Sequence, residues 1–367
     1  MIELRKIEAA LHRISICCLI SLFAVLTLLG CGGSSQSSNP PPPLKGQLYV
    51  VKPAPEKVLR FKMGDSGDVS PQAFGDLRSL GTPIGYAAID VTNDRLAAAS
   101  SATTSPGSVT LFDHVSTDFC PAGCSSLTRL ISGPATTLNL VGTPPALDGK
   151  HDLLYVLAFP GGGSSANIAV FGPASTITGN VPPLRILTTT FVVGEIVLDG
   201  DNDRLFAADT TNHAVAVFDN ASTLSGAVVP NRVITGPATQ ISFPLHLAVN
   251  TTANVLVVDD GPRSAGVTRI LVFSNPGTAN GNVAPMASST LVDQPQQPEQ
   301  LGVSPKGELY VVGGVAAGVG AFVAVYTNIT AANGNLAATR TILGPHTQLD
   351  DFAVPSVILG VALDPTR

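Results

Sequence analysis

Short apolar runs, each ending in a small polar residue and a turn, recur along the chain from about residue 46 to its end. The polar residues that end these runs, called anchors below, lie roughly 50 to 60 residues apart. They are Asp90, Asp148, Asp199, Asn250, Ser304 and Asp364. A second recurrent run alternates and closes on an aromatic residue, as in Val215-Ala-Val-Phe218. Runs of this length between Gly, Pro, Asn and Asp turns predict β-strands rather than helices.

Each repeat holds four such strands, the pattern of a propeller blade, and blades must pack as neighbours to bury both faces. The first repeat, from Gly46, lacks the strand that precedes an anchor, and the last, Ile358 to Asp364, is such a strand with nothing after it. Paired, the two ends complete one blade and remove an open sheet edge. We therefore predict an all-β, six-bladed β-propeller over residues 46–367. Five or seven blades remain open if one long repeat hides an insertion.

The repeat resembles NHL-type repeats and related six-bladed propellers, including the gluconolactonase-like group. The resemblance rests on the anchor Asp199, on Arg204-Leu-Phe-Ala-Ala-Asp209 and on the strand ending Ala216-Val-Phe-Asp219. It implies an architecture and not an activity, because such folds serve enzymes and binding modules alike. Gluconolactonase-like enzymes hold a metal with one Glu, two Asn and one Asp, and that set has no residue-by-residue match here.

The N-terminus has the layout of an export signal. Arg5, Lys6 and Arg13 precede an apolar run from residue 14 to 29, which is shorter than the roughly 20 residues of a spanning helix. Leu28-Leu29-Gly30-Cys31 resembles the lipobox of bacterial lipoproteins. The resemblance implies a signal peptide over residues 1–30, a lipid on Cys31 and a Gly/Ser/Pro tether over residues 31–45. The alternative is an uncleaved or ordinarily cleaved signal in which Cys31 is incidental.

This layout predicts a bacterial envelope protein whose membrane partner is reached through the lipid anchor. Gly32, in place of the Asp that retains enterobacterial lipoproteins, indicates the outer membrane. Cys17 and Cys18 lie in the predicted signal peptide and Cys31 carries the predicted lipid, which leaves Cys120 and Cys124. The oxidising environment of an exported protein favours a disulfide between these two over free thiols or a metal or redox role. A net charge of −6 gives no electrostatic case for binding nucleic acid, which would want a basic stripe.

The position four residues before each anchor is the candidate for chemistry, because equivalent positions of the repeat lie at one height around the channel. This position holds Tyr86, Pro144, Glu195, His246, Gln300 and Gly360. Four of them, Tyr86, Glu195, His246 and Gln300, form a candidate ligand site at a channel mouth; the alternative is that they are ordinary rim residues. The anchors themselves are interpreted as turn-forming side chains.

The sequence favours a non-catalytic binding or interaction module, without catalytic residues or a cofactor, for a protein, glycan or small-molecule ligand. The alternative is a metal-dependent, lactonase-type hydrolase, with Glu195 and His246 near a divalent metal at the channel mouth. A third possibility is a scaffold subunit of an envelope assembly.

Overall fold

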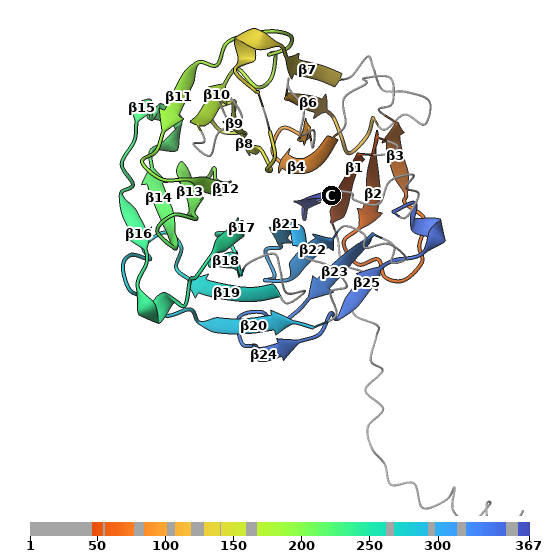
Figure 1. The fold of residues 1–367 in the computed structure, drawn as a ribbon. Coiled ribbons are helices and arrows are strands. Elements are labelled where there is room, and N and C mark those ends of the chain that lie inside the picture. The colour runs from red at the N-terminus through yellow and green to blue at the C-terminus, as the bar shows by residue number, and fades with distance from the viewer. Residues whose placement is uncertain are drawn as a thin grey trace, which may run out of the picture. The chain divides into compact units, whose positions relative to one another are not determined.

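Blades built from antiparallel strands surround a central axis in the computed structural model (Figure 1). The structure describes residues 46–53, 56–76, 84–100, 107–118, 128–139, 141–158, 167–261, 268–292, 298–313, 321–349 and 359–367. Cys31, Cys120 and Cys124 lie outside these residues, so the lipid site and the disulfide stay predictions, as do the signal peptide and tether. No helix in the described part of the chain has the length and apolarity to cross a membrane.

Within the described residues the strands form six sheets, which confirms the predicted propeller. From the axis outward, blade 1 holds β26 (Gly360–Asp364), β1 (Gln47–Pro53), β2 (Glu56–Lys62) and β3 (Ala73–Asp76). Blade 2 holds β4 (Ile84–Asp90), β5 (Arg95–Ser100), β6 (Ser108–Asp113) and β7 (Thr128–Ser132). Blade 3 holds β8 (Ala146–Asp148), β9 (Leu153–Ala158), β10 (Asn167–Phe171) and β11 (Arg185–Thr188).

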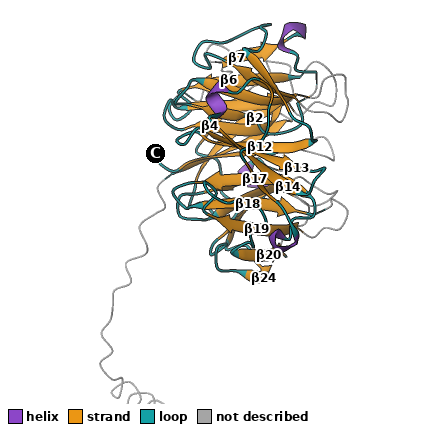
Figure 2. Ribbon diagram, turned by 90° about the vertical axis from the view of Figure 1, so that its left-hand side faces the viewer, coloured by secondary structure: helices purple, strands orange, loops and turns teal. Residues whose placement is uncertain are grey.

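The other three blades repeat this order. Blade 4 holds β12 (Val193–Asp199), β13 (Arg204–Asp209), β14 (Ala214–Asp219) and β16 (Arg232–Ile234). Blade 5 holds β17 (Pro244–Asn250), β18 (Val255–Asp260), β19 (Thr268–Ser274) and β20 (Ala287–Leu291). Blade 6 holds β21 (Pro298–Val303), β22 (Leu309–Gly313), β23 (Phe322–Tyr326) and β25 (Arg340–Ile342). Figure 2 shows that the helical segments are single short turns, such as η5 (Pro237–Thr239), among many strands.

The two ends of the chain close the ring as predicted. Strand β26 pairs antiparallel with β1, in a register that runs from Gln47 opposite Asp364 to Val51 opposite Gly360. The inner strand of blade 1 therefore comes from the C-terminus and its other three strands from the N-terminal part of the propeller (Figure 1). This pairing converts two unsatisfied sheet edges into one continuous ladder.

The outer edges of blades 2 to 6 are also covered, by loops that reach back from the next blade. Short strands β15 (Gly226–Ala227) and β24 (Asn333–Leu336) pair parallel with β11 and β20. Gly67, Gly179 and Gly281 form equivalent single bridges to Ile342, Ile131 and Ile234. All three glycines have positive φ, which residues with a side chain rarely adopt. These loops shield edge strands that would otherwise be free to pair with another chain.

The core lies between the blades. Every residue of β5, β9 and β18 is buried, since each of these strands packs against a neighbouring blade on both faces. The alanines of Arg95-Leu-Ala-Ala-Ala-Ser100 keep blade 2 thin enough for its neighbours to approach it. The apolar clusters join residues from adjacent blades, for example Tyr155 of β9 with Leu205 of β13.

In blades 2 and 4 an arginine of the fourth strand clamps its own blade. In blade 4, Arg232 donates two hydrogen bonds to the Asp219 carboxylate, at 2.8 and 2.9 Å, and Arg204 donates a third at 3.1 Å. In blade 2, Arg129 and Arg95 grip Asp113 in the same way. The hydrogen bonds from Arg232, followed by those from Arg204, lower the pKa of Asp219 below its usual 3.8.

Replacing Asp219 by Asn should lower the free energy of unfolding at pH 7 by about 1–2 kcal/mol, because both arginines lose a charged partner that is 29% exposed. A carboxyl whose pKa is lowered by folding stabilises above its unfolded pKa and loses that effect as the pH falls through its folded value. The difference between the two proteins should therefore shrink below about pH 3.8. Urea unfolding at several pH values measures it. Asp201→Asn, in an exposed turn, is the control, and equal stability of D219N and wild type at pH 7 would contradict the clamp.

Candidate functional site

The four predicted site residues share one structural feature, a β-bulge near the start of an inner strand. The pairing register shifts between Ile84 and Tyr86 in β4, and between Val193 and Ile196 in β12, where Glu195 lies. It also shifts between Pro244 and His246 in β17 and between Pro298 and Gln300 in β21. A bulge inserts one extra residue and changes the direction of the side chains beside it. The four side chains consequently take different directions although they are equivalent in the repeat.

Glu195 and His246 come together across the boundary between blades 4 and 5. The His246 Nδ1 atom lies 2.7 Å from Glu195 Oε2, and the backbone N–H of Leu247 donates to Oε1 at 3.4 Å. The Glu195 residue is 1% exposed and His246 is 6% exposed. The carboxylate is thus held by the neighbouring blade, as a buried polar group requires.

Gln300 instead reaches across the axis to two other blades. Its Nε2 atom donates to the carbonyl oxygens of Ala87 at 2.6 Å and Val361 at 3.0 Å. Its Oε1 atom accepts from the N–H groups of the same two residues, at 3.0 and 3.1 Å. One amide thereby links β21 to β4 and β26, and uses its two donors and two acceptor positions in doing so.

Gly360 allows β26 to come close to β4, and Tyr86 packs into the core. A Cβ atom on Gly360 would lie 2.6 Å from the backbone nitrogen of Ala87, so only glycine fits where β26 approaches β4. Tyr86 is 3% exposed and belongs to the apolar cluster between blades 2 and 3, with Leu154 and Val156. Its ring is therefore part of the core, apart from the Glu195–His246 contact.

A cavity of about 190 Å³ lies on the axis, and all six inner strands or the residues just before them line it. Glu195 and Gln300 lie at the end where the inner strands begin. Its wall two residues before the anchors is made of small side chains: Ala88, Ala146, Ala248, Gly302 and Ala362, with Val197 in β12. Among its lining residues Glu195 carries the one charged side chain. The cavity is thus mainly apolar, with a carboxylate and an engaged amide at one end.

A wider mouth of about 530 Å³ lies where the inner strands end. It shares Ile89, Leu147, Leu198 and Val249 with the inner cavity, so the two spaces lie one behind the other. The turns after the anchors form its rim, which includes Thr92, Lys150, Asp201, Thr251 and Thr252. The mouth therefore offers hydroxyl, carboxylate, ammonium and backbone groups above an apolar interior.

The anchor side chains cap the turns that follow them, as predicted. Asp90 accepts the N–H of Asn93, and Asp199 that of Asn202, at 3.1 and 3.3 Å. Asn250 and Ser304 cap the following turns in the same way. These contacts satisfy backbone N–H groups that have no hydrogen-bond partner in the β-ladder.

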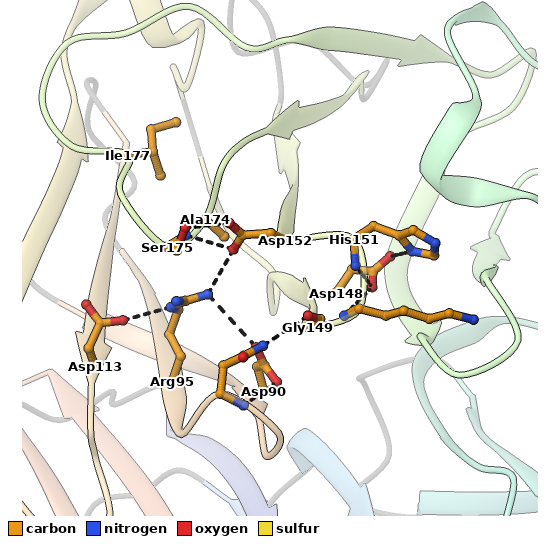
Figure 3. A network of polar contacts seen from close by, with 12 residues as sticks. Asp90, Arg95, Asp113, Asp148, Gly149, His151, Asp152, Ala174, Ser175 and Ile177 are labelled. Carbon is orange, nitrogen blue, oxygen red and sulfur yellow. Dashed lines mark hydrogen bonds and ion pairs between the residues drawn. The ribbon is translucent and has the colours of Figure 1, made fainter.

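One group of possible metal ligands was missed from the sequence. Asp148, His151 and Asp203 offer ligand atoms that all lie within 4.8 Å of one another. The His151 Nδ1 atom is 2.8 Å from Asp148 Oδ2, and Asp203 accepts the N–H and hydroxyl of Ser222 at 2.7 Å each (Figure 3 shows the first pair). The sequence pattern marks Asp148 only as an anchor, and Asp203 comes from the next blade, so the repeat alone does not bring the two residues together.

Solved structures similar to this chain share the propeller and little sequence. One, described as the nidogen/laminin complex, has a TM-score of 0.54 at 14% identity, covering 87% of this chain and 98% of that one. Another, a functionally unknown protein from Desulfotomaculum acetoxidans DSM 771, has a TM-score of 0.47 at 12% identity, covering 83% of each chain. No protein-family model and no curated protein sequence matches the chain. At such identities the likeness to the first structure shows the six-bladed fold alone.

Proposed function

We propose that the propeller is a non-catalytic binding module that takes a small molecule into its central channel from the wide mouth. The observation that carries the proposal is the cavity of about 190 Å³ on the axis, apolar along most of its wall. Pockets that bind small molecules are typically apolar with a few placed polar groups. Gln300 and Glu195 already hydrogen-bond other strands, which favours a fixed wall over reacting groups.

The two spaces suggest the shape of the ligand. An apolar cavity of roughly 150 Å³ holds a benzene ring, so the inner cavity suits a ring or short alkyl group. The mouth of about 530 Å³, with Thr92, Thr251 and Asp201 on its rim, suits a larger hydroxylated portion. An aryl glycoside has both parts and makes a practical probe.

Filling the inner cavity should weaken binding. Ala88→Leu adds a side chain to the cavity wall, and we expect it to weaken any aryl glycoside that binds wild type by roughly tenfold or more, a loss of about 1.4 kcal/mol. Binding is measured by calorimetry after a thermal-shift screen of a panel of such compounds. Ala337→Leu, on an exposed segment, is the matched control and should bind as wild type does. Equal affinity in A88L and A337L would place the ligand elsewhere and contradict the proposal.

A metal-dependent, lactonase-type hydrolase is the second candidate, and the buried Glu195–His246 contact is the observation in its favour. In that case a divalent metal would depend on Glu195, because it is the charged side chain of the inner cavity. Elemental analysis of wild type and Glu195→Gln separates the candidates. Equal metal content in both proteins would count against the hydrolase.

We also propose that the protein is exported and held in the bacterial envelope by lipid on Cys31, with a disulfide between Cys120 and Cys124. The order of basic residues, apolar run, Leu28-Leu29-Gly30-Cys31 and polar tether supports the anchor. Several acyl chains, each gaining about 0.8 kcal/mol per buried methylene, would anchor stably. Alkylation of the unreduced exported protein would reveal free thiols if the disulfide is absent.

Cys31→Ser should therefore move the protein from the detergent phase to the aqueous phase in a detergent partition and remove labelling by radioactive fatty acid. The reason is that the serine side chain offers no sulfur for the lipid. Cys18→Ser, within the apolar run, is the matched control and should stay lipidated. Fatty-acid labelling that survives in C31S would contradict the anchor.

A further inference from the structure

The boundaries between blades bring together two recurrent side chains, which we call the boundary pair. One is the anchor of a blade, and the other is a residue with positive φ in the first turn of the next blade. The positive-φ residues include Asp94 (φ 53°), Asp152 (φ 55°), Asp203 (φ 51°) and Asn254 (φ 55°). Where both members of the pair are acidic, two carboxylates lie close together and require a positive charge.

At two boundaries an arginine supplies that charge. Between blades 1 and 2, Arg367 Nη1 lies 2.6 Å from Asp364 Oδ2 and 3.3 Å from Asp94 Oδ1. Between blades 2 and 3, Arg95 Nη1 lies 3.9 Å from Asp90 Oδ2 and 3.2 Å from Asp152 Oδ1, and Figure 3 shows the guanidinium between the two acids.

The boundary between blades 3 and 4 has the two acids without the arginine. Asp148 pairs in register with Leu153, as Asp90 pairs with Arg95, so Leu153 occupies the arginine position. The carboxylates of Asp148 and Asp203 and the ring of His151 nevertheless offer atoms within 4.8 Å of one another. The side chain of Asp148 is fully buried, where water screens the repulsion least.

A buried hydroxyl without a partner faces the same place. Tyr155 is 0% exposed, and its hydroxyl has no hydrogen-bond partner among the described residues. Tyr155 follows Leu153 by two residues in β9, so both side chains lie on the same face of blade 3, and both belong to the apolar cluster that includes Leu205 of blade 4. Burial, followed by the carboxylates of Asp148 and Asp203, raises the pKa of the Tyr155 hydroxyl, and Arg185 lowers it. At the corresponding position of blade 6, the Tyr310 hydroxyl donates toward Glu308 and the Met63 carbonyl oxygen. An unmade hydrogen bond of a buried hydroxyl costs about 1–3 kcal/mol, so a missing partner is indicated here.

The nearby arginine does not fill the gap. Arg185 Nε and Nη2 have no hydrogen-bond partner, and within the described residues Arg185 forms no ion pair with Asp148 or Asp203. Its acidic partner is also missing, since Gly172 follows Phe171 where Asp113 follows Phe112 in blade 2.

We propose that Asp148, Asp203, His151 and the Tyr155 hydroxyl bind a divalent cation of the Ca²⁺ or Mn²⁺ class between blades 3 and 4. Such cations prefer carboxylate and other oxygen ligands, and Mn²⁺ also accepts an imidazole nitrogen. Each carboxylate oxygen has two lone pairs, so it binds the cation and keeps its hydrogen bond to the turn. His151 and Asp203 are partly exposed, and Gly149 and Lys150 beside them line the wide mouth, so the cation has a path from solvent. This structural site is separate from the channel ligand.

Calorimetry with the metal-stripped full chain, titrated with CaCl₂ or MnCl₂ alone, tests the site. We expect one cation per chain and a rise in melting temperature. Asp148→Asn and Asp203→Asn should each weaken binding by roughly tenfold or more, since loss of even an outer-shell group costs 10–100-fold. Both variants should fold, because blade 5 has Asn250 and Asn254 at these positions. Asp152→Asn, at the boundary with Arg95, is the matched control and should bind as wild type does.

Leu153→Arg provides a gain-of-charge test. It places a guanidinium where Arg95 lies in blade 2, so it should abolish cation binding and raise the melting temperature of the metal-free protein. Absence of binding by both salts to wild type would overturn the proposal. Binding that survives in D203N would also overturn it. So would a His151→Gln variant that is less stable than wild type at acidic pH while neither protein responds to metal, because protonated His151 would then be the positive charge at this boundary.

Discussion

The antiparallel pairing of β1 with β26 is the interaction on which the rest of the structure depends. A blade buries its two faces only against neighbours, and an open row of blades would leave the first and last with one exposed face each. Closing the row through the pairing of Gln47 with Asp364 to Val51 with Gly360 gives every blade two neighbours. The axial cavity, the amide of Gln300 that spans three blades, and the boundary pairs all exist because the ring closes. Removing that ladder would therefore destabilise every blade, and not only the two termini.

Much of the fold could be predicted because the repeat places equivalent residues in equivalent surroundings. The anchors from Asp90 to Asp364 mark the end of each inner strand. Their turn-capping role could be inferred because every such turn has backbone N–H groups without a partner in the β-ladder. The candidate site was less accessible to the same reasoning. Glu195, His246, Gln300 and Tyr86 are equivalent in sequence, but the bulges send His246 to Glu195, Gln300 to Ala87 and Val361, and Tyr86 into the core. A one-residue bulge depends on the partner strand, which the sequence of a single strand does not show.

The inner strands show how a propeller can keep an axial cavity without losing stability. Small residues two positions before the anchors leave the space open, while polar groups at the narrow end bind across it. Because Gln300 satisfies its own donors and acceptors with backbone groups of two other strands, the narrow end is tied together by hydrogen bonds instead of apolar packing. Such a wall is rigid before a ligand arrives, which lowers the ordering cost of binding. The hydrogen bonds that Gln300 and Glu195 already make support the proposed binding module.

Positions that depart from the repeat carry more information about function than those that obey it. Arg95 lies opposite the acidic anchor Asp90 and Arg204 opposite Asp199, whereas Leu153 lies opposite the acidic anchor Asp148. Apolar substitution alone would leave two carboxylates facing each other beside an unsatisfied hydroxyl, a combination whose costs add up in a buried boundary. The repeat could have relieved the repulsion with an asparagine, as it does at Asn254, yet Asp203 and Asp148 are both acids. A loss of arginine with retention of both acids is therefore better explained by a replacement cation than by loss of the interaction.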